Sequence, residues 1–164
     1  MKQRFKLKGV DKFFNKLEET LKKKEIAVTT KGCMRVAIFI RNESEKTYPV
    51  VPVDTGHLRA SFFTFIKGSD NSIQTVPAAA TAIKPVPAAV TQQTNANLTL
   101  LKTTVTALPT PGMIFGFAAN YAMAVHEKKG AEWNRPNSGP KYFLTHLVRN
   151  KKKLLTILAE SAKE

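Results

Sequence analysis

The chain has 164 residues, of which 43% are apolar and 23% are charged, and its formal net charge is +14. This length suits one hydrophobic core, so we expect residues 1–164 to form a single domain. No apolar run reaches the roughly 20 residues that a membrane-spanning helix needs, and the basic start MKQRFKLKGVDKFF lacks the apolar region of a secretory signal. We therefore expect no membrane partner.

The positive charge is concentrated at the two ends of the sequence. Residues 1–49 carry 13 basic and 6 acidic side chains, residues 50–119 carry 4 and 2, and residues 120–164 carry 9 and 4. Such a surplus attracts polyanions and predicts salt-sensitive, nonspecific contact with nucleic acid. A solvated basic surface explains the same charge, and this holds also for the basic run RNKKK at residues 149–153. Both interpretations stay open.

The first third of the chain predicts helix. The alternating FKLK at residues 5–8 allows a short strand, and apolar residues then recur at helical spacing. The pattern weakens near residues 29–32 and resumes at Met34, which predicts one long helix or two in tandem ending near Glu45. Cys33 is the single cysteine, so it forms no internal disulfide, and we expect it to be buried filler. The first apolar stripe is Val10, Phe13, Phe14, Leu17 and Leu21.

Residues 52–61, PVDTGHLRAS, predict a structural corner rather than a reaction centre. Pro52 forces extended backbone on its predecessor, Asp54 or Thr55 can cap a short helix, and Gly56 permits an unusual φ. In this interpretation Leu58 anchors the corner in the core and Arg59 pairs with a carboxylate, for which we predict Glu127. The predicted corner motif consists of Pro52, Asp54, Thr55, Gly56, Leu58, Arg59 and Ser61.

The middle of the chain predicts strands around an unusual insert. FFTFIKG at residues 62–68 is aromatic and β-branched, as is typical of a strand. Residues 69–111 hold five of the nine prolines and three charges, and we expect an extended insert or arm at about residues 69–97. LTLLKTTVTA at residues 98–107 and GMIFGFA at residues 112–118 then predict two strands, paired as a hairpin across LPTPG.

The last third predicts a short helix, a loop and a C-terminal helix. NYAMAVHEKKG supplies the short helix, and Gly139 and Pro140 are well placed to start the last one. The whole chain is therefore predicted to be α+β: a long N-terminal helix, a central antiparallel sheet of about three to four strands, a short helix and a C-terminal helix. The apolar stripe of that last helix is Phe143, Leu144, Leu147, Val148, Leu154, Leu155 and Leu158.

Candidate catalytic and metal-binding patterns are weak. His57, His126 and His146 are far apart in the sequence, which does not favour a metal site. Asp54, His57 and Ser61 are close together, but no nucleophile-elbow glycines surround the serine. No phosphate-binding loop or dinucleotide fingerprint is present. We therefore expect no catalytic residue, no cofactor and no metal, and we do not expect an enzyme.

Three motifs in order resemble the tail-completion and head–tail joining proteins of long-tailed bacteriophages. They are PVDTGHLRASF at residues 52–62, ANYAMAVHEKKG at residues 119–130 and GPKYFLTHLV at residues 139–148. The resemblance covers about residues 9–160 apart from the insert. This sequence departs from the family's Glu-x-Gly pattern, because one additional residue separates Glu127 from Gly130.

The resemblance implies a structural protein of the virion neck, assembled in the host cytoplasm. Such proteins form a homo-oligomeric ring, usually a hexamer, that terminates the tail tube and joins it to the head connector. The implied partners are other copies of the chain, the connector or stopper protein, the tail tube and the sheath, with transient contact to genomic DNA. Candidate interface residues are Tyr121, Glu127, Trp133, Phe143, Pro77, Pro85 and Pro87.

Other functions stay open on the sequence alone. A free basic nucleic-acid-binding protein would explain the charge, and a head-side closure or minor capsid protein would explain the motifs. A small hydrolase using His57 or His126 is the third alternative. Solution mass, presence in virus particles and the salt dependence of DNA binding separate these classes.

Overall fold

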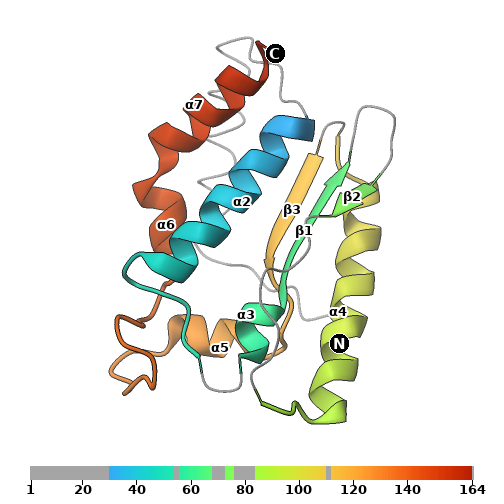
Figure 1. Ribbon diagram of the computed structural model, residues 1–164. Helices are drawn as coiled ribbons and strands as arrows, with labels where there is room; N and C mark the ends of the chain where they lie inside the picture. Colours follow the sequence, from blue (N-terminus) through green and yellow to red (C-terminus); the bar gives the residue numbers. More distant parts are fainter. Residues whose placement is uncertain (1–29, 54–55, 68–72, 76–83, 110–111, 164) are drawn as a thin grey trace.

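The computed structural model describes residues 30–53, 56–67, 73–75, 84–109 and 112–163. Its strands form one antiparallel sheet in the order β2-β1-β3, and helices precede, interrupt and follow it (Figure 1). The predicted α+β class is therefore confirmed. The elements are α2 (Thr30–Lys46), α3 (His57–Ala60), β1 (Phe62–Lys67), β2 (Ile73–Thr75), α4 (Ala88–Thr106), β3 (Gly112–Phe117), α5 (Ala122–Glu127), α6 (Leu144–Arg149) and α7 (Lys151–Ser161).

Helices cover both faces of the sheet. In Figure 1, α2 lies between the sheet and α7, α4 lies on the opposite side, and α3 and α5 lie together near one end. Strand β1 is central, and it pairs with β3 from Phe62 opposite Phe117 to Lys67 opposite Gly112. Because side chains alternate across a strand, Phe63 and Phe65 reach the α4 layer while Ile66 packs beside Cys33 of α2.

Coverage on both faces explains the composition of β1. Its residues from Phe62 to Ile66 are all buried, including Thr64, so the strand reads as an almost continuous apolar run rather than an alternating one. The predicted strand at residues 62–68 is confirmed over Phe62–Lys67, and the predicted strand at residues 112–118 over Gly112–Phe117. Strand β3 therefore pairs with β1, which lies far from it in the sequence.

The predicted strand at residues 98–107 is wrong, and so is its hairpin with residues 112–118. These residues belong to α4, which begins at Ala88 directly after Pro85 and Pro87. The extended insert proposed for residues 69–97 is therefore wrong from Ala88 onward. Threonine-rich composition favoured a strand, but no proline interrupts α4, and its buried side follows helical spacing. The residues on that side are Val90, Thr94, Leu98, Leu101 and Val105.

The C-terminal helix starts later than predicted and is divided. Lys141 has a φ of 58°, in the left-handed region, so a right-handed helix cannot run through from Pro140, and α6 begins at Leu144. Asn150, with a ψ of 9°, separates α6 from α7. The predicted apolar stripe holds for Leu147, which is fully buried, but fails for Val148, which is 60% exposed.

Helices α2, α6 and α7 enclose one apolar cluster. Val36 and Ile40 of α2 meet Leu147 of α6 and Leu154 and Leu158 of α7, and all five are buried. The predicted end of the N-terminal helical region near Glu45 is confirmed by α2, which ends at Lys46. The predicted strand at residues 5–8 and the stripe from Val10 to Leu21 lie outside the described residues.

Candidate functional site

The corner between α2 and β1 is built by one glycine and one short helix. Gly56 has a φ of 81°, where an L side chain is strained, and it is the N-cap of α3. The four residues of α3 follow, and the Ser61 hydroxyl donates to the Leu58 carbonyl at 2.7 Å, which closes the turn into β1. The left-handed glycine predicted here is confirmed. Asp54 and Thr55 lie outside the described residues.

Leu58 anchors the corner in a second apolar cluster, as predicted. It is 5% exposed and packs with Val51, Ala119, Ala122 and Tyr142. The members of this cluster come from all three motifs, because Leu58 belongs to the first, Ala119 and Ala122 to the second and Tyr142 to the third. Segments more than 80 residues apart in the sequence therefore share one buried junction.

Arg59 pairs with Glu45, not with Glu127. Its Nη2 lies 2.8 Å from Glu45 Oε2, and both side chains are about one-fifth exposed. The guanidinium of Arg135 lies beside the same pair, where it donates to the Glu45 carbonyl at 2.6 Å and to the Val51 carbonyl at 3.3 Å. Burial, with the nearby Arg59 charge, lowers the pKa of Arg135. The end of α2, the corner and the loop after α5 are thus tied together.

Glu127 joins the second and third motifs instead. One carboxylate oxygen contacts Lys141, and the other lies 2.9 Å from His126 Nδ1. These contacts, Lys141 first, lower the pKa of Glu127, whereas burial lowers the pKa of His126. The backbone follows the same route, since the Lys141 N–H donates to the His126 carbonyl at 2.7 Å. The Tyr142 hydroxyl donates to the Ala122 carbonyl at 3.2 Å.

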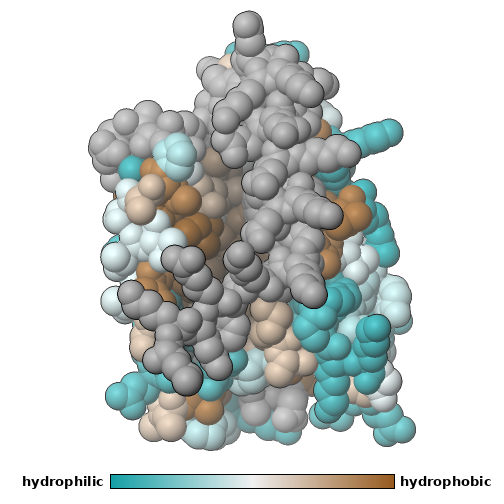
Figure 2. All heavy atoms as spheres, turned by 180° about the vertical axis from the view of Figure 1, so that it is seen from behind, coloured by the Kyte–Doolittle hydropathy of each residue, from teal (hydrophilic) through white to brown (hydrophobic). Residues whose placement is uncertain are grey.

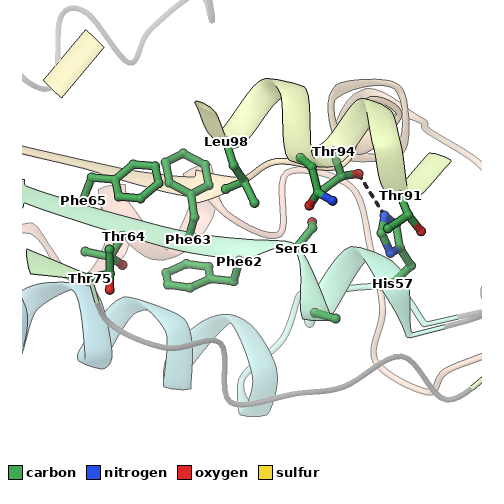
Figure 3. Close-up of a pocket in the computed structure, with 12 residues that line it drawn as sticks. His57, Ser61, Phe62, Phe63, Thr64, Phe65, Thr75, Thr91, Thr94 and Leu98 are labelled. Atoms are coloured by element: carbon green, nitrogen blue, oxygen red, sulfur yellow. Dashed lines mark hydrogen bonds between the residues drawn. The ribbon is translucent and has the colours of Figure 1, made fainter. Parts of the chain in front are cut away.

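A hollow of about 350 Å³ lies between the corner, β1 and the first half of α4 (Figure 3). His57 Nε2 is 3.0 Å from the Thr94 hydroxyl, and that hydroxyl donates to the Val90 carbonyl at 2.9 Å. The contact between His57 Nε2 and the Thr94 oxygen therefore joins the corner to α4. The Ser61 hydroxyl donates to the Leu58 carbonyl, so Ser61 closes the corner while His57 connects it to α4.

Sequence reasoning missed the contribution of α4 to this region. Thr94 holds His57, and the Asn97 side chain donates to the Ala118 carbonyl at 2.9 Å. The signal that could have found them is the helical spacing of Val90, Thr94 and Leu98. That spacing places Thr94 and its apolar neighbours on the side of α4 facing the sheet.

The candidate interface residues lie in different environments. Phe143 is half-buried, with edge-on ring contacts to Phe115 and Phe117, so it connects the two apolar clusters within the chain. Tyr121 packs beside the corner cluster, and Trp133 is half-buried. The remaining candidates are Glu127, engaged as described above, Pro85 and Pro87, which are exposed at the start of α4, and Pro77, which lies outside the described residues.

Within the described ranges, no three His, Cys, Asp or Glu side chains are grouped so that they could hold a metal ion. In that part of the chain no helix combines the length and the apolar character that crossing a bilayer requires. Cys33 is 3% exposed, and burial raises the pKa of its thiol to about 11, which confirms the predicted role as core filler.

The fold and the junction define an α+β protein whose three sequence motifs build one buried support. No family model, no curated protein and no solved structure matches this chain.

Proposed function

We propose that this chain is a structural protein of the neck of long-tailed bacteriophages. In this proposal several copies form a ring at the head-proximal end of the tail, which terminates the tail tube and joins it to the head connector. The proposal begins from the resemblance of the three motifs, in their order, to tail-completion and head–tail joining proteins.

The observation that carries the proposal is the convergence of the three motifs in one cluster. Leu58, Ala122 and Tyr142 are buried against one another, and the backbone of Lys141 is bonded to that of His126. Motif residues that build a support are what a structural subunit requires, because its neighbours must find surfaces held in fixed positions. The polar groups of the corner are engaged in the same support: His57 contacts Thr94, and Ser61 donates to Leu58.

The experiment interrupts the gene in the virus that encodes the chain and examines the particles produced. We expect unjoined heads and tails, with tails of abnormal length, and we expect the wild-type gene supplied in trans to restore infectious particles. Mass spectrometry of purified wild-type particles should detect the chain in a fixed, small copy number. Its absence from finished particles, or normal joining without it, would overturn the proposal.

A further inference from the structure

One side of α4 differs from the other exposed helical surfaces of the described chain. The helix buries the side that carries Thr94 and Val105, and its opposite side is exposed over about four turns. We call this opposite side the outer face of α4. It consists of Ala89, Gln92, Gln93, Ala96, Thr99, Leu100 and Thr103, all of which are exposed. The spacing of three and four residues places them along one line of the helix.

The outer face of α4 carries no charge. Among the 19 residues of α4 the only charged side chain is Lys102, which lies about 120° around the helix from Ala96 at the centre of this face. By contrast, α7 begins with three consecutive lysines, and the whole chain has a net charge of +14. Seen from behind (Figure 2), the side where α4 lies shows pale residues together with brown apolar ones, and strongly hydrophilic residues are more abundant on the opposite side.

The threonine hydroxyls of this face are already hydrogen-bonded within the helix. The Thr99 hydroxyl donates to the Asn95 carbonyl at 3.1 Å, and the Thr103 hydroxyl donates to the Thr99 carbonyl at 3.1 Å. The neighbouring Thr104 hydroxyl donates to the Leu100 carbonyl at 2.9 Å. Such hydroxyls lose little when water is removed, because their donors keep their partners. Leu100 is 67% exposed among them, so covering the part of this face from Thr99 to Thr103 buries an aliphatic side chain at low polar cost.

We propose that the outer face of α4 is the surface against which a second copy of this chain packs. Two copies repel each other wherever their basic surfaces meet, so a self-contact is favoured where like charge is absent. A partner of opposite charge would instead be drawn to the lysine-rich surfaces, which makes an identical copy the occupant that fits an uncharged face. The small residues Ala89, Ala96 and Thr99 permit close approach of a neighbouring element.

The proposal rests on the ring assembly proposed above and gives it a location. In a ring the contact is heterologous, so the outer face of α4 meets a different surface of the next copy. Helix α4 has 19 residues and is about 28 Å long, which is enough for the centre of such an interface. Residues flanking the helix must supply the remaining area, because stable interfaces bury about 800 Å² on each partner.

The test introduces a charge into this face of the full-length chain, with a closely matched control. Thr99→Lys places a cation on this face, and Thr156→Lys places one on the exposed side of α7. Both threonines are exposed and both hydroxyls donate to the carbonyl four residues earlier at 3.1 Å, so the two changes remove the same local bond. Lysine is a better helix former than threonine, so neither variant should unfold. Circular dichroism and thermal unfolding check this.

Self-association is measured by sedimentation velocity over protein concentration, and by the presence of each variant in rings on particles from a complemented gene deletion. We expect Thr99→Lys to weaken association about tenfold or more, high salt to restore part of it, and Thr156→Lys to behave as wild type. Thr99→Gln, which adds length without charge, should retain association. Wild-type association by Thr99→Lys, or no self-association of the wild-type chain in either setting, would overturn the proposal.

The two proposals fail differently. If the chain is absent from virus particles but Thr99→Lys still abolishes association in solution, the proposed neck function is wrong. The proposal that the outer face of α4 binds a second copy is then retained. If the chain is present in particles and Thr99→Lys assembles normally, only the assignment of this face is wrong.

Discussion

Shortening Leu58 tests whether the corner is a structural support. Leu58 is 5% exposed and contacts residues of all three motifs, including Ala122 and Tyr142, so Leu58→Ala leaves a cavity that its neighbours cannot easily fill. Buried Leu→Ala changes cost about 2–5 kcal/mol, and we expect about 3 kcal/mol here because α3 is short and lies near the surface. For a chain of this size, that corresponds to a fall in Tm of roughly 6–12 °C.

Urea unfolding followed by circular dichroism measures this loss. The midpoint should fall while the slope with denaturant stays constant, since the surface exposed on unfolding is nearly the same. Leu100→Ala, measured in dilute solution, removes the same atoms from a side chain that is 67% exposed, and it should change stability by less than about 0.5 kcal/mol. If the two variants had equal stability, Leu58 would not anchor the corner and the structural interpretation of the motif would be refuted.

Three further predictions concern polar groups and the thiol. A double-mutant cycle with Arg59→Met and Glu45→Gln should give a coupling of about 1 kcal/mol, because the pair is 2.8 Å apart and only partly exposed; no measurable coupling would make the contact incidental. Because burial lowers the pKa of His126 below its ordinary 6.5, the unfolded chain takes up more protons as the pH falls through 6.5, so stability decreases there. The urea midpoint should drop between about pH 7.5 and pH 5.5, and an equal drop in His126→Gln would assign the effect to other groups. Cys33 should not react with a thiol reagent at mildly alkaline pH until urea unfolds the chain, since burial raises its pKa to about 11; rapid reaction of the native protein would contradict the burial.

The sequence was sufficient where local pattern and burial agree. The aromatic and β-branched run of β1, the apolar spacing of α2 from Val36 to Ile40 and the left-handed Gly56 were all predicted from neighbouring residues. In each case the local preference of the residues and their tertiary environment favour the same conformation.

It was insufficient where tertiary packing decides between two local preferences. The threonines of α4 favour a strand by intrinsic propensity, but Leu98, Leu101 and Val105 meet the aromatic side chains of β1 only if the segment is helical. The partner of Arg59 was missed for a similar reason. Glu127 stands in a motif, but Glu45 at the end of α2 lies beside the corner, and nothing in the spacing of the sequence reveals that proximity.

Substitutions on the two sides of α4 test folding and assembly separately. Ten of the 19 residues of α4 are threonine, valine or asparagine, which are weaker helix formers, and its buried side packs on the sheet through Val105 and its neighbours, so burial contributes much of its stability. Val105→Ala should therefore loosen the helix and destabilise the whole chain by about 1–3 kcal/mol, which would disturb the outer face of α4 indirectly. Thr99→Lys leaves the buried side intact and changes only what a neighbour meets. A loss of association without a loss of stability is thus a result that the outer-face substitution can give and the core substitution cannot, and this difference distinguishes an interface from a weakened fold.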